Sequence, residues 1–408
     1  MKMLISFAAL FLSVALLQLS SGGVGPLDAL SGIQLEFTTE QIGLLGSAHF
    51  IGFFLGCWWA PRLMGTVGQS RAFAAFTAAG AIGLLTHMLI INPYAWSLMR
   101  IATGLCIAGC YTVVESWIQA KATNKNRGRT LGVYRFVDLS AALLAQMVIS
   151  VLEPASYVSY NLLAIICCMA LLPLTLTRTP PPEIPKAPRL RPYFAVKNSP
   201  LAAVAIIIAA LSGSAFRMVG PLYGERIGLT VDEIAWFLSA FILGGAIAQY
   251  PVGWLADRFD RRLVMIWLSV ATIISCVTII ATQSSGRIEI LLSAVFFGFT
   301  SFPIFSVAAA HAHDFADSSE RVELSAALIF WFATGAIASP LLASILIGLF
   351  SPSALFLFIS VGHLALIIFG SIRMLTRPSS HKKTGFVYAP RTSFIIGHIL
   401  KRRKLEDK

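Results

Sequence analysis

The chain contains the short charged segment Gly253-Trp254-Leu255-Ala256-Asp257-Arg258-Phe259-Asp260-Arg261-Arg262. It separates two long apolar runs and gathers acidic and basic side chains in one short loop. Asp257 stands near a helix end, where it can pair with basic residues of neighbouring helices and hold the loop in one of two positions. A loop that only sets membrane topology is the simpler interpretation. The candidate gating residues are Gly253, Asp257, Arg258, Arg261 and Arg262.

Apolar runs like the two beside this loop recur along the whole chain. Apolar residues make up 57% of the 408 positions and charged residues 12%, and the mean hydropathy is +0.78. A soluble fold could not hide so much apolar surface, whereas lipid is a solvent that suits it. About 20 apolar residues cross a hydrocarbon core of ~30 Å. We predict twelve membrane-spanning helices, at 4–27, 40–60, 72–92, 95–118, 130–152, 156–177, 200–222, 233–256, 263–283, 288–311, 323–346 and 352–375.

The predicted helices fall into two groups of six around a proline-rich interruption. Prolines crowd the segment from Pro180 to Pro188, which cannot be helical throughout. The segment therefore reads as a linker between two blocks. We expect an N-terminal six-helix bundle over 1–177, a cytoplasmic linker over 178–199, a C-terminal six-helix bundle over 200–375 and a basic cytoplasmic tail over 376–408.

Short sequence echoes link the two halves. They occur in the same order and at corresponding helix positions in each half, which favours an internal repeat. Repeated halves are the usual architecture of secondary transporters, whose site lies near the bilayer midplane between them. The echoes are Val24-Gly25-Pro26-Leu27 with Val219-Gly220-Pro221-Leu222, and Ser47-Ala48 plus Gly52 with Ser239-Ala240 plus Gly244.

The distribution of positive charge predicts the orientation. The chain holds 31 lysines and arginines, and most fall in alternate loops, the linker and the tail. Only Arg226 and Arg287 lie in the opposite loops. Because positive charge stays inside, we expect a multi-pass protein of the cell inner membrane with both termini cytoplasmic. The net charge of +12 is spread over many loops, which argues against nucleic acid, and the tail run 401–404 is expected to lie near anionic membrane lipids.

Ionisable side chains within the fourth and fifth predicted spans are candidates for solute binding or coupling. An unpaired charge at bilayer depth costs at least ~2.5–3.5 kcal/mol, so each needs a partner or a watery cavity. Ion pairs of Arg135 with Glu115 and Asp138 are one interpretation, and a direct role in the solute pathway is the other. We favour Arg100 as the solute contact because no acid shares its depth on these two spans. The candidates are Arg100, Tyr111, Glu115, Arg135, Asp138 and Gln146.

Other polar side chains inside predicted spans complete the candidate set. Arg217 is expected to pair with Asp28 of the other half. His49 lies near the middle of the second span and could carry a coupling proton, although a packed hydrogen-bonding role is the simpler interpretation. Trp331 is expected to cluster with Phe302, Phe305 and Phe330 of the tenth and eleventh spans, and this cluster either packs in the core or stacks on a flat solute.

Two further histidine groups and the cysteines carry no predicted chemistry. His311 and His313, with Asp314, lack the additional ligands that a metal site needs, and we expect neither a metal nor a cofactor. His87 and His363 are expected to be structural. The six cysteines all fall inside apolar runs and are interpreted as small buried hydrophobic residues.

The charged loop resembles the signature loop of the major facilitator superfamily, which has Gly, then Asp-Arg, then a basic pair. The first-half counterpart, Gly56 to Arg71, departs from it because Ala60-Pro61 replaces Asp-Arg. Arg100 followed by small residues resembles the helix-four motif, which the superfamily ties to proton or substrate coupling. The resemblance implies an all-α integral membrane protein with 12 transmembrane helices in two pseudo-symmetric six-helix bundles. It also implies a monomeric transporter that works by alternating access.

Further segments resemble the YcaD-like branch of this superfamily. The members of that branch with a named role are alphaproteobacterial riboflavin transporters, so the resemblance implies riboflavin as the best substrate assignment. Coupling to protons, or facilitated diffusion without them, remains open. The matching segments are Pro61-Arg62-Leu63 with Gly68 and Arg71-Ala72-Phe73, Glu115-Ser116-Trp117 with Arg127-Gly128-Arg129, and Gln249 to Trp254 running into Asp257 to Arg262.

Other functions have less support. An efflux pump for a drug or metabolite is the nearest alternative, but the fifth span, Leu131 to Val151, lacks the Gly-Pro pair expected of drug–proton antiporters. A membrane-embedded enzyme would need a nucleophile–base pair or a metal set, and neither pattern is present. A receptor or channel is the remaining alternative. The protein is therefore expected not to be an enzyme.

Overall fold

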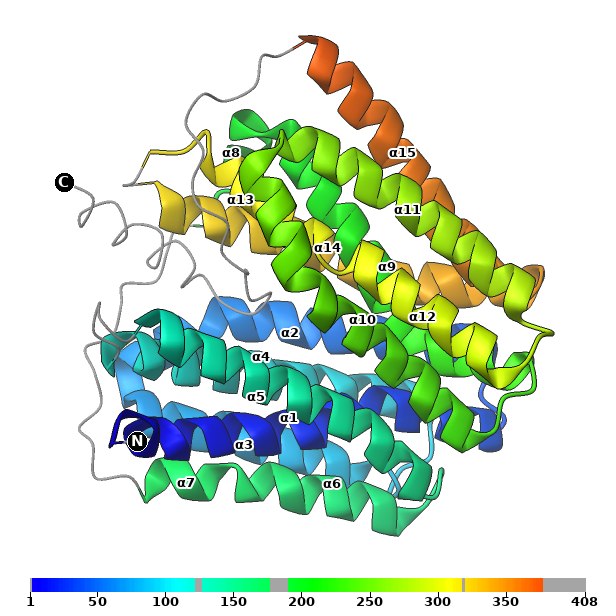
Figure 1. The fold of residues 1–408 in the computed structure, drawn as a ribbon. Helices are drawn as coiled ribbons and strands as arrows, with labels where there is room; N and C mark the ends of the chain where they lie inside the picture. The colour runs from blue at the N-terminus through cyan, green and yellow to red at the C-terminus, as the bar shows by residue number, and fades with distance from the viewer. Residues whose placement is uncertain (1, 122–126, 177–189, 318–319, 377–408) are drawn as a thin grey trace. The chain divides into compact units, whose positions relative to one another are not determined.

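The structure is a computed structural model that describes residues 2–121, 127–176, 190–317 and 320–376. The regular elements in these ranges are helices (Figure 1). Those before residue 187 are α1 Lys2–Gln34, α2 Thr39–Val67, α3 Gln69–Thr86, α4 Pro93–Lys121, α5 Arg127–Val148, η1 Ile149–Val151, α6 Tyr157–Met169 and α7 Leu171–Thr175. Those after it are α8 Pro192–Asn198, α9 Pro200–Arg226, α10 Val231–Arg258, α11 Arg261–Thr282, α12 Arg287–Ser301, α13 Ile304–His313, α14 Arg321–Leu349 and α15 Ala354–Thr376.

Each predicted span is helical over most of its described length. Within the described ranges, eleven helical segments have the length and apolar composition to cross a membrane. The predicted third span corresponds to α3, whose 18 residues are long enough but whose mean hydropathy is lowered by Gln69, Ser70 and Arg71 in its first turn. The rest of α3 is apolar, so α3 takes the place of the third span with a polar first turn.

Two predicted spans consist of two helices each. The span predicted at 288–311 breaks between α12 and α13 beside Pro303, which has no N–H to continue the helical hydrogen bonds. The span predicted at 156–177 breaks between α6 and α7, three residues before Pro173. Proline chemistry thus explains both differences from the predicted continuous helices.

The chain divides into two compact units, Met1–Ala187 and Pro188–Lys408. The boundary falls within the predicted linker 178–199, of which residues 178–189 lie outside the described part. The described end of the linker is not irregular, because Pro192–Asn198 forms the short helix α8. Pro192 is the first residue of α8, a position where the missing N–H is harmless. The predicted tail 376–408 lies outside the described residues except for Thr376, the last residue of α15.

Each unit repeats the same set of helix pairings. In the first unit, α1 packs on α5, α2 on α4 and α3 on α6. In the second unit, α9 packs on α14, α10 on α12 and α11 on α15. The helix starts repeat as well, since Thr38 caps α2 with Gln41 and Thr230 caps α10 with Glu233 in the same capping box. The internal repeat predicted from the sequence echoes is therefore present in three dimensions.

In each unit, two glycines allow the backbones of one helix pair to touch. A methyl group built on Gly52 of α2 would lie 2.0 Å from the Ile101 carbonyl oxygen of α4, and one on Gly104 would lie 2.0 Å from the His49 carbonyl oxygen. In the second unit, the same construction puts Gly244 2.0 Å from the Val295 carbonyl oxygen and Gly298 1.9 Å from that of Phe241. The α2–α4 and α10–α12 crossings therefore exclude any side chain at these positions.

Candidate functional site

Three helices of the first unit bring an acid and a base together in its interior. Asp28 of α1 and Arg100 of α4 are each 1% exposed, and the Asp28 Oδ2 atom lies 3.2 Å from the Arg100 Nε atom. The Tyr160 hydroxyl of α6 donates a 2.8 Å hydrogen bond to the other carboxylate oxygen of Asp28. Burial of the two charges is tolerable because each stabilises the other. Arg100 is thus a cationic partner of Asp28 within the first unit.

An aromatic cage surrounds this ion pair. The His87 ring stacks on Tyr160 at a centroid distance of 4.9 Å, and Trp96 packs against both rings. The His87 Nδ1–H donates to the Gly83 carbonyl oxygen, which leaves Nε2 facing Asp28 at 3.6 Å. His87, which was predicted to be structural, is fully buried beside the acid. A proton on Nε2 would convert this contact into a second ion pair.

A second polar network joins α4 to α5. Arg135 lies 3.3 Å from Glu115 and 3.4 Å from Asp138, so both predicted ion pairs are present. The Tyr134 hydroxyl donates to the same oxygen of Glu115, and the Tyr111 hydroxyl lies 2.6 Å from Asp138. This network is more open than the Asp28–Arg100 pair, because the side chains of Arg135 and Asp138 keep 15% and 18% of their surface exposed.

The remaining predicted site residues are placed apart from these two networks. Gln146 of α5 donates to the Gly22 carbonyl oxygen of α1 and serves helix packing. His49 lies at the α2–α4 crossing with its ring against Phe50. Arg217 is half-buried on α9. The Trp331 indole N–H donates to the Pro192 carbonyl oxygen, so this side chain ties α14 to α8.

The aromatic residues predicted to cluster with Trp331 make several separate ring contacts. Phe302 packs against Phe241, whereas Phe305 packs against Phe332. Only Phe330 contacts Trp331 among the ring pairs of the described residues. The physical reason is the break at Pro303, which changes the direction in which residues on its two sides point.

The charged loop between α10 and α11 is organised around a buried arginine. Arg261 is 2% exposed and lies 2.7 Å from Asp314, the residue that follows α13. Its guanidinium also donates to the carbonyl oxygens of Ala310 and Ala256. Asp257 lies 3.3 Å from the same guanidinium but keeps 48% of its side chain exposed. The closest acidic partner of Arg261 is therefore Asp314 rather than Asp257. The sequence pattern did not indicate this contact.

The other charges of the loop are paired locally. Arg262 and Asp260 form a 2.6 Å ion pair, and the Arg258 guanidinium stacks 4.3 Å above the Trp254 ring. Gly253 is buried in the last turns of α10. The first unit has no arginine at the position that corresponds to Arg261. Arg261 is the first residue of α11, and the first residue of α3 is instead the buried Gln69. The departure of the first half from the charged-loop pattern thus extends to this position.

Removal of Asp314 is expected to destabilise the protein more than removal of Asp257. Asp314→Ala leaves the buried Arg261 charge without its closest acid, and breaking a buried pair costs about 3–5 kcal/mol. Asp257→Ala removes a half-exposed partner, for which about 0.2–1 kcal/mol is typical. Melting temperatures of the purified variants check the order. Equal losses in the two variants would contradict the assignment of Asp314 as the main partner.

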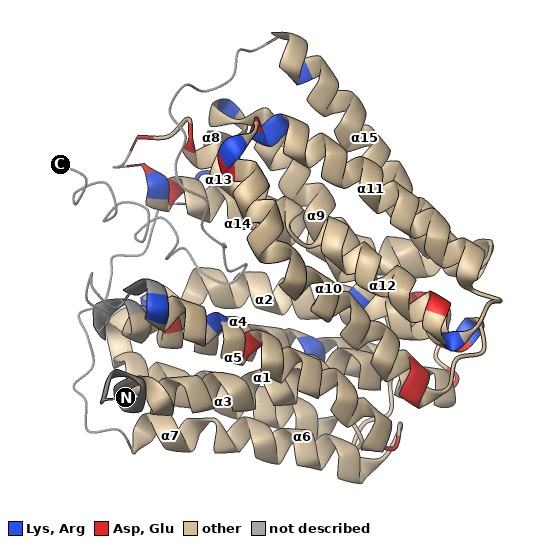
Figure 2. Ribbon diagram, viewed as in Figure 1, with Lys and Arg blue, Asp and Glu red and all other residues tan. Residues whose placement is uncertain are grey.

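Few charged side chains lie in the middle of the helices, and most of them are near helix ends (Figure 2). Among the described residues, no group of histidine, cysteine, aspartate and glutamate has the arrangement of a metal site. Two repeated helical units with paired charges inside them define a membrane carrier of the secondary-transporter class.

Comparison with known proteins identifies the family. The sequence profile of the Major Facilitator Superfamily matches residues 10–230 and 202–405, and the chain belongs to this superfamily of small-solute transporters, not to an enzyme family. An uncharacterised MFS-type transporter of Enterobacter sp. (strain 638) is 27% identical over 86% of this chain and 90% of its own length. The uncharacterised MFS-type transporter YcaD of Escherichia fergusonii is 25% identical over 84% of this chain and 88% of its own length.

Solved structures share the fold. The crystal structure of the nucleoside transporter NupG has a TM-score of 0.73 at 16% identity and covers 89% of this chain and 97% of its own. That of the D-xylose-proton symporter has a TM-score of 0.67 at 15% identity and covers 93% of this chain and 99% of its own. The protein is thus a multi-pass membrane protein with the superfamily fold, as the sequence predicts.

Proposed function

We propose that this transporter takes up riboflavin, or a planar solute of the same chemistry, across the cell inner membrane by alternating access of its two units. In this proposal both termini and the linker face the cytoplasm, because most basic residues lie in the loops on that side. The substrate assignment comes from the resemblance to the riboflavin transporters of the YcaD-like branch.

The observation that carries the proposal is the partly exposed network of α4 and α5. Arg135 and Asp138 lie within apolar helices, and yet both keep surface for a solute. Tyr111 adds a hydroxyl beside Asp138. Flavin presents carbonyl and imide groups on one ring edge and hydroxyls along its ribityl chain, which these donors and acceptors can bind. Arg100, fully buried in its own ion pair, then supports the site rather than touching the solute.

Proton coupling is the second part of the proposal. Asp28 has a base on each side, Arg100 at 3.2 Å and His87 at 3.6 Å. Protonation of Asp28 would weaken its attraction to both bases and so favour a different packing of α1 against α4. The cluster can therefore link a proton to a change of conformation.

Growth of a riboflavin auxotroph that lacks its own importer tests the proposal. The wild-type protein is expected to rescue growth at limiting riboflavin. Asp138→Asn is expected to lower riboflavin uptake at least about tenfold, since a hydrogen bond to a charged group contributes ~1.5–3 kcal/mol. Asp317→Asn, the same change at an exposed position after α13, is the matched control and should behave as wild type.

Three outcomes would contradict the proposal in different ways. Failure of the well-expressed wild type to rescue growth would remove riboflavin as the imported solute. Riboflavin uptake that is unchanged in Asp138→Asn would remove the α4–α5 network from the solute site. Loss of riboflavin from loaded cells would indicate efflux, the alternative direction.

A further inference from the structure

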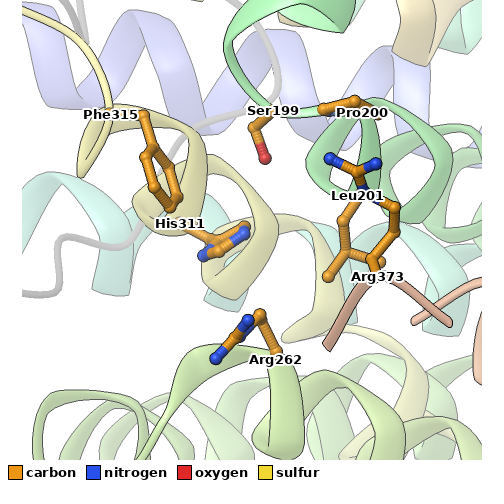
Figure 3. Close-up of a pocket in the computed structure, with 7 residues that line it drawn as sticks. All are labelled: Ser199, Pro200, Leu201, Arg262, His311, Phe315 and Arg373. Carbon is orange, nitrogen blue, oxygen red and sulfur yellow. The ribbon is translucent and has the colours of Figure 1, made fainter. Parts of the chain in front are cut away.

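Two hollows in the second unit lie at opposite ends of α9. The first lies where α9 begins, and Figure 3 shows Arg262, His311 and Arg373 around it. Its cavity volume of about 20 Å³ has room for one water molecule, and Arg262 is already paired with Asp260. The second hollow lies where α9 ends, and its cavity volume of about 570 Å³ falls within the ~300–1,000 Å³ typical of small-molecule sites. Of the two, the second hollow therefore has the size to hold an organic ligand.

Three neighbouring segments of the second unit form this larger hollow, and local contacts fix them. They are the turn between α9 and α10 and the first turns of α10 and of α12. Thr230 and Glu233 form the capping box that fixes the start of α10. Further along the same helices, Gly244 and Gly298 allow α10 and α12 to meet at backbone contact. The walls of the hollow are thus set before a ligand arrives, which lowers the cost of binding.

Trp236 gives the larger hollow an aromatic wall. It is 57% exposed, and within the described part of the chain no other aromatic ring contacts it. Leu229 and the buried Ile290 line the same space. The indole face is therefore open to a ligand, and such a face attracts a cation within about 6 Å of the ring centre.

One negative charge in the larger hollow is not balanced. Glu233 of α10 and Arg287 of α12 form an ion pair in its wall. Asp232, which is exposed and also lines the hollow, makes no hydrogen bond or ion pair with the described residues. Two acids therefore face one base, and the negative charge that is left over favours a cation and disfavours an anion.

We propose that this hollow binds a small organic cation with a quaternary ammonium group, whose charge lies against the Asp232 carboxylate and the Trp236 ring. Both groups favour a positive charge, the ring through its negative face and the carboxylate through its unbalanced charge. Riboflavin carries no positive charge, and the α4–α5 network that is proposed to bind it belongs to the first unit. The hollow is therefore a second site with a ligand class of its own.

Binding of choline to the purified protein in an uncharged detergent tests the proposal. Choline carries a quaternary ammonium group, and its carbon isostere, in which a tert-butyl group replaces the trimethylammonium group, has the same shape without the charge. Saturation-transfer NMR is expected to show that choline binds with saturation and that the neutral isostere does not compete with it. Asp232→Asn is expected to weaken choline binding at least about fivefold, because unit charges about 4 Å apart attract each other even in bulk water. Trp236→Leu should weaken it about two- to fivefold.

Matched variants separate the hollow from general surface effects. Asp232→Glu keeps the charge and should retain most of the choline binding. Asp317→Asn and Trp267→Leu make the same two changes at exposed positions outside the hollow and should bind choline as the wild type does. The proposal is overturned if choline does not bind the wild type, if the neutral isostere binds equally well, or if folded Asp232→Asn binds choline as the wild type does. An equal loss in Asp317→Asn would also overturn it, because general surface charge would then explain binding.

Discussion

Arg100→Gln is expected to abolish transport and to lower the free energy of unfolding by about 3–5 kcal/mol. The change removes the cation 3.2 Å from Asp28 and leaves that buried carboxylate with Tyr160 and the His87 ring as its remaining partners. A neutral glutamine cannot balance the charge, so the interior of the first unit would have to admit water or a proton. Melting temperature and solute uptake of the purified variant measure the two effects.

The double variant Asp28→Asn/Arg100→Gln separates stability from transport. Because it removes both charges together, we expect it to recover most of the melting temperature lost in the single variant. Transport should stay absent, since the group that binds the proton is gone. An Arg100→Gln protein that melts like the wild type would show that the ion pair does not hold the unit together. Full transport by the double variant would make the pair purely structural.

Gly104→Ala and Gly298→Ala are expected to prevent stable folding of their units. Each added methyl group would lie within about 2 Å of a backbone carbonyl oxygen, that of His49 or of Phe241. Overpacking of a core costs ~1–3 kcal/mol when side chains can move aside. Here the obstacle is backbone, so the helices must separate and the cost should be higher. The monodisperse fraction in size-exclusion chromatography measures the loss.

Gly65→Ala on α2 is the matched control. Nothing lies within 4 Å of a methyl group built at Gly65, so the substitution meets open space. Alanine is also the better helix former by roughly 0.5–1 kcal/mol, and the variant should be as stable as the wild type or slightly more so. Normal folding of Gly104→Ala would contradict the close helix crossing in the first unit.

Local patterns in the sequence predict the helices and the ion pairs between consecutive helices. Apolar runs indicate the position of every span to within several residues, because membrane insertion depends on local composition. The contacts of Arg135 with Glu115 and Asp138 are predictable, since α4 and α5 are consecutive and antiparallel and their depths can be compared. The sequence echo that pairs Gly52 with Gly244 falls at the two close helix crossings, α2 with α4 and α10 with α12.

The partners that sequence patterns do not predict come from helices distant in the chain. Asp28 and Arg100 lie on α1 and α4, and no comparison of consecutive helices brings them together. Asp314 follows the helix break at Pro303, so its direction cannot be derived from a continuous helix. The sequence does contain one usable signal: Asp28, Arg100 and His87 are ionisable groups within apolar surroundings, and such groups need one another.

The proposed function requires that this chain alone carries riboflavin through a lipid bilayer. Uptake of radiolabelled riboflavin into liposomes that contain only the purified protein tests it most directly. We predict uptake that saturates with riboflavin concentration, that unlabelled riboflavin inhibits, and that Arg100→Gln abolishes. Uptake that equals that of protein-free liposomes, or that rises in proportion to concentration without saturating, would contradict the claim.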